Sequence, residues 1–304
     1  MLILFDSNQL CYAGHFASQN GPQQLSYKGM NTSVIFYFLK TVLGVYKKYG
    51  TSNMVFCWDS KKSNRKVLFP PYKEKRRENM TEEERRLLDE AFVQFMALRM
   101  VVLPSMGFAN IFRKTGYESD DIIASVALHA GDEEEVVIVS SDHDFYQLLG
   151  PGTTIYDPKK GVERDHHWFR REFAVGPAEW STVLAVAGCS TDNVPGVPGV
   201  GVKTAIKYLH GELDGKSKVV GKIRESLEDI DFYYQLVNLP LEGTGTFELR
   251  ENYLGEKRVW ENFEYYGFHS FMREEGWAEW QSLINDRPLE KKMRRRKRLA
   301  KRDI

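Results

Sequence analysis

The feature that most constrains the fold is the alternation of short apolar runs with longer amphipathic segments. Apolar runs typical of buried strands occur at residues 2–5, 54–58, 101–103, 136–139 and 153–156. Segments with helical spacing of apolar residues lie between them, at residues 32–49, 82–100, 119–130 and 143–149. Strands that alternate with helices predict an α/β fold, in which helices flank a mixed, mainly parallel sheet.

The pattern changes after Gly161, where apolar residues at helical spacing predominate as far as Leu239. This stretch predicts helices at residues 165–173, 177–187 and 202–210. Beyond Leu241 the pattern is weak and rich in aromatic residues, which we interpret as packing. The predicted organisation is therefore an α/β core over residues 1–160, a helical lobe over 161–240 and an extension over 241–304 with a basic tail.

Charge is balanced overall but unevenly distributed. The chain has 42 Lys and Arg residues and 42 Asp and Glu residues, and its basic residues crowd residues 61–77 and 291–302. Basic patches on a neutral protein predict a polyanionic partner bound at a defined place. For the tail alone, a solubilising and disordered segment is an equally good interpretation.

The apolar runs and the cysteines indicate the kind of cellular compartment to expect. No apolar run reaches the roughly 18 residues of a membrane span, and the apolar start lacks the basic flank and cleavage site of a signal peptide. The 3 cysteines are scattered and form no Cys-x-x-Cys pair, so a disulfide framework or a zinc site is not expected. We therefore expect a protein of a reducing compartment that has no membrane segment.

Several carboxylates follow the predicted strands directly; they are Asp6, Asp59, Asp142 and Asp144. The carboxyl ends of parallel strands meet at one edge of a sheet. Glu118, Asp120 and Asp121 open a predicted helix. Any one of these acids has an ordinary explanation as a cap or a helix-dipole partner. As a set they would repel one another unless divalent cations relieve the repulsion, so the sequence predicts a magnesium site.

The stretch "GCSTDNVPGVPGVGVKTA", residues 188–205, combines glycine and proline to an unusual degree. Such a backbone turns tightly and lets a ligand approach, and the helix that follows offers free N–H groups to an anion. Lys203 and Thr204 are predicted in the first turn of that helix. The pattern indicates a helix-hairpin-helix module that grips a DNA backbone without reading bases. The alternative is an unusual glycine-rich turn without a ligand.

Together these motifs resemble the structure-specific 5′ nucleases, a family of flap endonucleases, 5′-nuclease domains of bacterial DNA polymerases and bacteriophage 5′-3′ exonucleases. The segments that carry the resemblance are "FDSN", "FCWDSKKSNRK", "PPYKEKRRE", "YESDDIIA", "VSSDHDFYQLL" and "DNVPGVPGVGVKTA". They extend from about residue 2 to 239, and their order is most similar to that of the compact phage enzymes. The resemblance implies a PIN-like fold with a helical arch at about residues 60–86.

The resemblance also implies site residues and cofactors. A first metal cluster would contain Asp6, Asp59, Glu118, Asp120 and Asp142, and a second would contain Asp121, Asp144 and Asp192. The implied cofactors are two Mg²⁺ ions, for which Mn²⁺ substitutes. Catalytic roles on the scissile phosphate would fall to Tyr72, Lys73 and Arg76. Residues implied in DNA binding are Arg65, Lys66, Gly196, Gly199, Gly201, Lys203 and Thr204. The carbonyls of Val197 and Val200 would bind a potassium ion.

One position departs from the family pattern. Members usually have Gly-Asp-x-x-Asp-Asn before the hairpin, whereas this chain has Cys189 at the first aspartate position. A neutral thiol is a poor ligand for magnesium. Three outcomes stay open: Asp144 and Asp192 hold the second ion well enough, second-metal occupancy is weak, or cleavage is impaired while binding survives. We favour the first, because the other acids are intact.

The implied function is hydrolysis of DNA phosphodiester bonds near 5′ ends, on branched, flapped or nicked duplexes. RNA–DNA hybrids as substrates and replication proteins as partners of the basic tail are left open. A monomer in the cytoplasm of a bacterium or phage-infected cell is expected. The rival hypotheses are a branched-DNA-binding protein without catalysis and a related single-strand ribonuclease. The second rival is disfavoured because a duplex-gripping hairpin would have no role in it.

Overall fold

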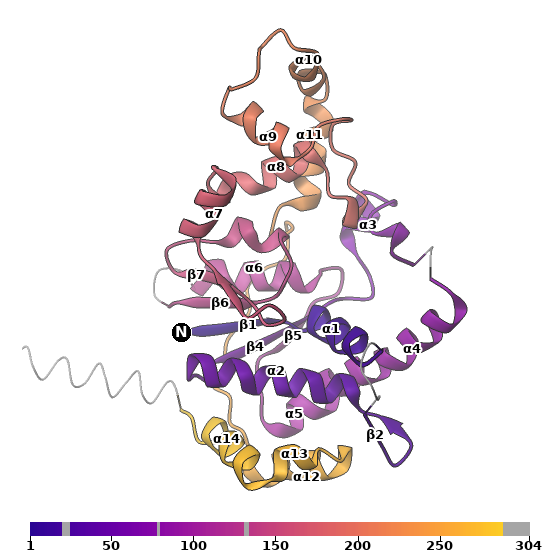
Figure 1. Cartoon of the computed structure of the whole chain (residues 1–304), viewed down its shortest axis with the longest axis vertical. Helices are drawn as coiled ribbons and strands as arrows, with labels where there is room; N and C mark the ends of the chain where they lie inside the picture. The colour runs from indigo at the N-terminus through magenta and orange to yellow at the C-terminus, as the bar shows by residue number, and fades with distance from the viewer. Residues whose placement is uncertain (20–24, 78–79, 131–133, 288–304) are drawn as a thin grey trace, which may run out of the picture. The chain divides into compact units, whose positions relative to one another are not determined.

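The computed structural model describes residues 1–19, 25–77, 80–130 and 134–287 (Figure 1). The chain divides into two compact units. The first contains Met1–Trp58, Glu83–Phe112 and Glu248–Ile304, and the second contains Asp59–Glu82 and Arg113–Phe247. This division cuts across the predicted ranges 1–160, 161–240 and 241–304, which stay a prediction. No helix in the described ranges is long and apolar enough to cross a membrane.

The strands of the first unit are β1 (Leu2–Asp6), β4 (Met54–Trp58) and β5 (Ile111–Arg113). β4 lies between the other two. β1 and β4 are parallel, and the stacked rings of Phe5 and Phe56 lie 4.9 Å apart at opposed positions. Every residue of β1 and β4 is buried. These strands are continuous apolar runs because neither of their faces meets water.

The principal helices of the first unit are α1 (Ser7–Gln19) and α2 (Ser33–Tyr49), which pack on each other. The apolar positions predicted for α2, from Val34 to Val45, are buried as expected. Gly50 ends the helix in the left-handed region, with φ of 65°. A short antiparallel pair, β2 (Ser26–Tyr27) and β3 (Met30–Asn31), precedes α2.

The strand predicted at residues 101–103 is wrong. Helix α4 (Glu82–Ala97) continues through a π-helical turn, Leu98–Val102, into α5 (Leu103–Met106). Two residues of this apolar run, Val102 and Leu103, are fully buried on the inner side of the helix, whereas Val101 is exposed. Gly107 then reverses the chain with φ of 106°, where a Cβ atom would overlap the carbonyl of Tyr253. The neighbour of β4 is instead β5, which is too short to give a strand pattern.

The extension contains α12 (Glu256–Tyr266), α13 (His269–Met272) and α14 (Glu274–Ile284). Phe263, Phe271 and Trp280 form its centre, with ring centroids 5.0 to 5.5 Å apart. The interpretation of these aromatic residues as packing is therefore confirmed. The basic tail after residue 287 lies outside the described residues.

The second unit begins with α3 (Asn64–Leu68) and a 3₁₀ turn, η1 (Glu74–Arg77). Its strands are β6 (Val136–Val139), β7 (Thr153–Asp157) and β8 (Val162–Arg164). β6 and β7 are parallel, and β8 returns antiparallel to β7. Helix α6 (Ser119–Ala130) precedes β6, and η4 (Asp144–Leu148) follows it. The prediction of an α/β fold with mixed, mainly parallel strands is confirmed.

The helical part of the second unit is α7 (His166–Phe173), η5 (Pro177–Glu179), α8 (Trp180–Ala187), η6 (Ser190–Asp192), α9 (Val202–Leu209), α10 (Lys218–Glu225) and α11 (Leu227–Val237). α8 is the central helix of this group and packs against α9 and α11 (Figure 1). Tyr146 of η4 contacts the rings of Phe169 and Trp180. This aromatic contact fixes η4, and hence the acids at its start, against the helices.

Candidate active site

The start of helix α6 holds the first group of acids in place. Asp59 accepts the backbone N–H of Ser119 at 2.8 Å and its hydroxyl at 3.0 Å. The same hydroxyl lies 3.2 Å from Asp120. Burial, together with the charge of Glu118, raises the pKa of Asp59 above its usual value. These acids are therefore close enough in space to oppose one another's ionisation.

Glu118 is an acid whose charge the protein itself neutralises with two cations. Its carboxylate accepts the Lys73 ammonium at 2.7 Å and the Tyr72 hydroxyl at 3.1 Å, and it lies 3.8 Å from the Arg65 guanidinium. Burial by itself would raise the pKa of Glu118, but the two cations hold that pKa below its usual value. Glu118 is therefore an ionised group at neutral pH.

A second group of acids gathers at the start of η4 and at the hairpin. The ligand atoms of Asp144, Cys189 and Asp192 all lie within 4.8 Å of one another. Asp144 also donates its backbone N–H to the carboxylate of Asp142 at 2.9 Å. Burial and the charges of Asp142 and Asp192 raise the pKa of Asp144 to about 7. Clustered carboxylates of this kind favour a bound cation.

Tyr72 and Lys73 lie against this second group. The Tyr72 hydroxyl donates to Asp192 at 2.7 Å, and the Lys73 ammonium lies 3.6 Å from the same carboxylate. Lys73 also donates its backbone N–H to the Asp192 carbonyl at 2.9 Å. Burial opposes the charge of Lys73, yet the charges of Glu118, Tyr72 and Asp192 raise its pKa well above the usual value. Lys73 is thus a fixed ammonium between the two groups of acids.

The backbone at Lys73 is itself unusual. Its φ is 54°, in the left-handed region that few residues other than glycine adopt. Residues held in such conformations are concentrated at functional sites, because the surrounding structure must enforce them. Here the hydrogen bond from the Lys73 N–H to Asp192 is one enforcing contact.

Asp121 and Arg65 form a buried ion pair that no residue pattern indicated. The guanidinium contacts both carboxylate oxygens, at 2.7 and 2.8 Å, and the exposed fractions are 2% for Arg65 and 0% for Asp121. Arg65 donates further to the carbonyls of Leu236 and Asn238, and Asp121 accepts the N–H of Leu241. The metal contact predicted for Asp121 and the DNA contact predicted for Arg65 stay predictions.

Three other residues were predicted to belong to the site: Asp6, Lys66 and Arg76. Asp6 is 3% exposed at the end of β1 in the first unit, where it accepts the N–H of Gln9 at 3.2 Å. Its membership of the metal cluster stays a prediction. Lys66 is exposed on α3. Arg76 belongs to η1, but its side chain lies outside the described residues, so its catalytic role also stays a prediction.

Within the hairpin, two glycines are required by the fold itself. Gly188 has φ of 80°, and a Cβ atom there would come within 2.5 Å of the Pro195 carbonyl. Gly196 has φ of 63°, and a Cβ atom would overlap the backbone of Gly188. The two arms of the hairpin therefore touch through their main chains. This contact accounts for the glycine at position 196, whose role in DNA binding stays a prediction.

The other two glycines face open space. Added Cβ atoms at Gly199 and Gly201 would meet no described atom within 4 Å. Gly201 precedes α9, so Lys203 and Thr204 lie in the first turn of that helix, as predicted. Val197 already accepts a backbone hydrogen bond from Val200 at 3.0 Å. The potassium site at these two carbonyls stays a prediction.

Cys189 is held inside the second group of acids. Its sulfur lies 3.0 Å from the Thr191 hydroxyl. Burial and the charges of Asp144 and Asp192 raise the pKa of the thiol to about 11. The group therefore offers two carboxylates and a neutral sulfur. Magnesium is commonly held through one or two carboxylates together with water and phosphate oxygens. The expectation that Asp144 and Asp192 hold it without an aspartate at position 189 stays a prediction.

Asn193 lies in one of the sequence motifs, but no role was predicted for it. Asn193 adopts φ of 59°, and its side-chain amide donates to the Pro71 carbonyl at 2.8 Å. It therefore joins the hairpin to the loop that carries Tyr72 and Lys73. Asparagine enters the left-handed region more readily than most residues, and this preference is the only signal in the sequence.

The arrangement of strands, helices and hairpin defines a PIN-like 5′ nuclease fold. The solved structure of the T5 5′-exonuclease with bound zinc aligns with a TM-score of 0.67 and 22% identity, covering 79% of this chain and 89% of that one. Residues 1–174 match the family described as "5′-3′ exonuclease, N-terminal resolvase-like domain". The chain belongs to this family, as the sequence motifs predicted.

Two curated relatives illustrate the range of the family. The 5′-3′ exonuclease of Halalkalibacterium halodurans is 27% identical over 245 residues, which cover 77% of this chain and 76% of the relative. The DNA polymerase I of Mycobacterium leprae is 29% identical over 241 residues, which cover 75% of this chain but 25% of the polymerase. The chain thus spans about a quarter of the polymerase and three quarters of the exonuclease.

Proposed function

We propose that the protein is a metal-dependent 5′ nuclease that hydrolyses DNA phosphodiester bonds near 5′ ends. Its substrates would be flapped, branched or nicked duplexes, and its products would carry a 5′-phosphate. The observation that carries this proposal is the placement of Lys73 and Tyr72 between Glu118 and Asp192, beside the cluster of Asp144 and Asp192. A fixed ammonium beside clustered carboxylates suits a reaction between metal-bound water and a phosphate.

The proposed cofactors are two Mg²⁺ ions, for which Mn²⁺ substitutes. One would be held by Asp144 and Asp192. The other would be held by Asp6, Asp59, Glu118, Asp120 and Asp142. Such ions activate a water and stabilise the leaving oxygen of a phosphodiester. The raised pKa values of Asp59 and Asp144 support this assignment, because burial and then neighbouring carboxylates disfavour their charged forms, and bound cations would relieve that cost.

The residues between the two groups of acids would position and neutralise the phosphate. Lys73 supplies a permanent positive charge, which would offset the charge that develops on the phosphoryl oxygens. Tyr72 fixes the orientation of Asp192 through its 2.7 Å hydrogen bond. Arg76 is proposed as a second cation on the same phosphate.

We assign a positioning role to Asp121 and Arg65. Asp121 accepts the backbone N–H of Glu118 at 3.0 Å, and Arg65 lies 3.8 Å from the Glu118 carboxylate. The pair thus fixes both the backbone and the charge environment of Glu118. The metal contact of Asp121 and the DNA contact of Arg65 that the family resemblance implied stay predictions.

Duplex binding is proposed for the hairpin and the start of α9. Gly199 and Gly201 leave the backbone accessible, and Lys203 and Thr204 lie at the helix start, where N–H groups attract a phosphate. Potassium at the carbonyls of Val197 and Val200 would strengthen the same contact. RNA–DNA hybrids are proposed as further substrates, and DNA replication as the setting. The protein is proposed to act as a monomer.

The test is a cleavage assay on end-labelled flap and nicked duplexes, with Mg²⁺ and with EDTA. We expect short 5′-phosphorylated products in Mg²⁺ and none in EDTA. A gel-shift measurement in parallel reports binding. Binding to flaps without cleavage in either condition would refute the enzymatic proposal and favour the branched-DNA-binding protein.

Replacing Cys189 with aspartate is expected to lower the Mg²⁺ concentration that gives half-maximal cleavage. The change adds a carboxylate where the neutral thiol now lies beside Asp144 and Asp192. This Mg²⁺ concentration should fall roughly 10-fold, because single groups near a metal change its affinity by about this factor. A Mg²⁺ titration of both proteins measures it, with Cys189→Ser as the uncharged control. An unchanged titration curve would show that this position does not contact the metal.

A further inference from the structure

Helix α9 carries basic residues well beyond the hairpin. Lys207 and His210 follow Lys203 at spacings of four and seven residues, which places all three on one face of the helix. All three are exposed, whereas Ala205 on the opposite face is fully buried. The stripe therefore runs along the solvent side of α9, from its first turn to its C-terminal end.

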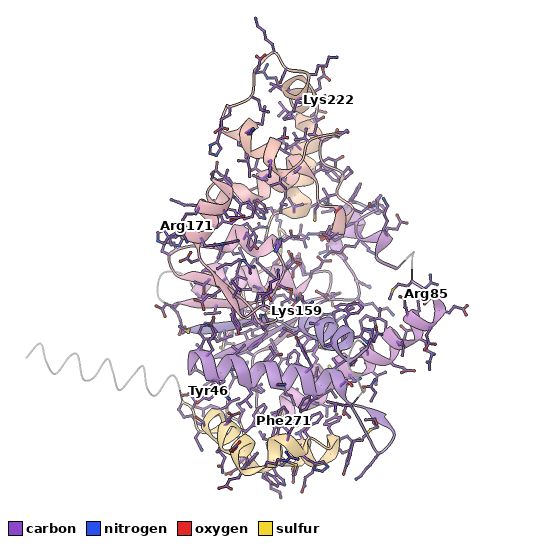
Figure 2. The ribbon with its side chains drawn as sticks, viewed as in Figure 1. Tyr46, Arg85, Lys159, Arg171, Lys222 and Phe271 are labelled. Carbon is purple, nitrogen blue, oxygen red and sulfur yellow. The ribbon has the colours of Figure 1, made fainter. Side chains whose placement is uncertain are left out.

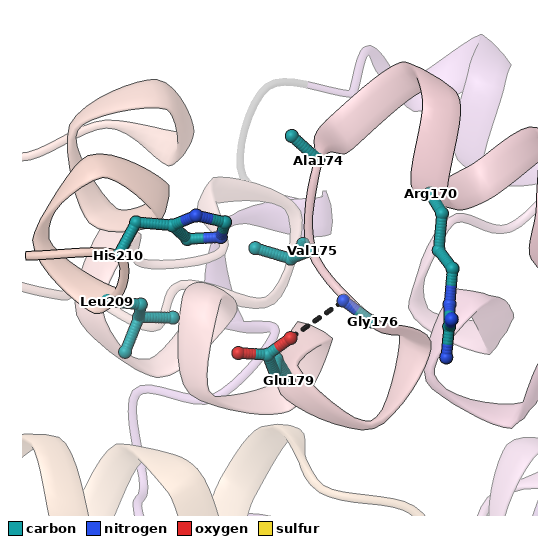
Figure 3. Close-up of a pocket in the computed structure, with 7 residues that line it drawn as sticks. All are labelled: Arg170, Ala174, Val175, Gly176, Glu179, Leu209 and His210. Carbon is teal, nitrogen blue, oxygen red and sulfur yellow. Dashed lines mark hydrogen bonds between the residues drawn. The ribbon is translucent and has the colours of Figure 1, made fainter. Parts of the chain in front are cut away.

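The far end of this stripe opens on a hollow of about 510 Å³. Its lining comes from the end of α9, with Leu209 and His210, and from α7 and the loop that follows it, with Arg170 and Gly176 (Figure 3). Two groups that can donate hydrogen bonds, the His210 ring and the Arg170 guanidinium, thus border one space. They come from helices separated in sequence by α8.

Two acids lie near these donors, but neither is paired with Lys207 or Arg170. Glu179 lines the hollow, but its carboxylate accepts the N–H of Gly176 at 2.7 Å (Figure 3). Glu212 lies 3.9 Å from the His210 ring. Within the described residues, the side chains of Lys207 and Arg170 have no hydrogen bond or ion pair. This contrasts with Lys73 and Arg65, whose charges are matched by carboxylates.

We propose that Lys207, His210 and Arg170 form a second phosphate-binding surface, along which the bound DNA duplex continues after it leaves the hairpin. This inference rests on the proposed function, since it extends the duplex site of that function. Along the helix, Lys203 to His210 spans roughly 10 Å at 1.5 Å per residue. One DNA strand carries a phosphate about every 3.4 Å of its axis, so the stripe is long enough to meet more than one phosphate of a strand.

The hollow then has a specific role. A phosphate and its sugar need space between the flanking donors, and the hollow at the end of the stripe provides it. Backbone contacts of this kind position a duplex without reading its bases. The surface is therefore expected to strengthen binding to duplexes of any sequence that reach past the hairpin.

The test measures the dissociation constant of a nicked duplex at several salt concentrations in EDTA, so that cleavage plays no part. The logarithm of the association constant falls linearly with the logarithm of the salt concentration. Loss of one phosphate contact reduces the magnitude of this slope by about 0.9. We expect this decrease for Lys207→Gln and for Arg170→Gln, together with weaker binding at each salt concentration. Lys207→Arg, which keeps the charge, should keep the slope.

A matched control lies on α10, where Lys222 is also exposed but away from the stripe (Figure 2). Lys222→Gln should leave the slope unchanged. If Lys203→Gln lowers the slope while Lys207→Gln and Arg170→Gln do not, the second surface is refuted and the hairpin site stands. If the wild-type protein binds no duplex, the proposed function fails as well. Thermal unfolding confirms folding of each variant, since these side chains support no described contact.

Discussion

Replacement of Asp192 by asparagine is expected to reduce DNA cleavage about 1,000-fold while DNA binding is retained. Asp192 lies close to several other groups of the candidate site. It accepts the Tyr72 hydroxyl, lies 3.6 Å from the Lys73 ammonium and shares a cluster with Asp144 and Cys189. Since Cys189 contributes no charge, the variant would leave Asp144 as the one carboxylate of that cluster. A metal ion contributes several kcal/mol to stabilisation of the transition state, and each 1.4 kcal/mol is a factor of ten in rate.

Single-turnover cleavage of a labelled flap measures this effect, and a gel shift in EDTA measures binding separately. Asp214→Asn is a matched control, because Asp214 lies in a surface loop of the same unit, where its side chain accepts the Lys216 N–H. Asparagine keeps that acceptor, so neither cleavage nor binding should change. Cleavage by Asp192→Asn at more than a tenth of the wild-type rate would contradict the placement of a metal at this cluster.

Replacement of Lys73 by methionine is expected to reduce the cleavage rate constant by about 100-fold or more. The variant keeps the length of the side chain but removes the ammonium between Glu118 and Asp192. Substrate affinity should change little, because the hairpin and the start of α9 are proposed to hold the duplex. The effect should therefore appear in the single-turnover rate at saturating enzyme.

The matched control is Lys75→Met, two residues further along, where the side chain is exposed. It should cleave at the wild-type rate. The variant Lys73→Arg separates charge from geometry, since it restores the charge with a broader, planar group. If Lys73→Met and Lys75→Met reduce the cleavage rate equally, the loop contributes only its overall positive charge. That result would contradict a specific role for Lys73.

Much of the fold could be predicted because the strands are continuous apolar runs. β1 and β4 are buried along their whole length, and their sequences contain no alternative helical period. The error at residues 101–103 arose where an apolar run belongs to the buried side of a helix, since short runs fit either structure. β5 has three residues, which is too few to show a period.

Asp6, Asp59, Asp142 and Asp144 could be predicted from their positions after strands and Asp192 was implied by the family resemblance, but the partners of the acids could not be predicted. The pairing of Arg65 with Asp121 joins residues 56 positions apart, and the sequence shows only that both are charged. Likewise, the sequence could not show that the backbone of Gly196 lies against that of Gly188. Which glycine serves the fold and which serves a ligand depends on contacts between segments, and these appear only in three dimensions.

The Arg65–Asp121 pair has a consequence for how such sequences diverge. Removing one member of a buried ion pair leaves an uncompensated charge, at a cost of about 3–5 kcal/mol, whereas exchanging both for apolar residues is often tolerated. A typical domain is stable by only about 5–15 kcal/mol, so a lone change at either position consumes a large part of that margin. Positions 65 and 121 are therefore expected to covary among descendants of this chain, even though both side chains are buried.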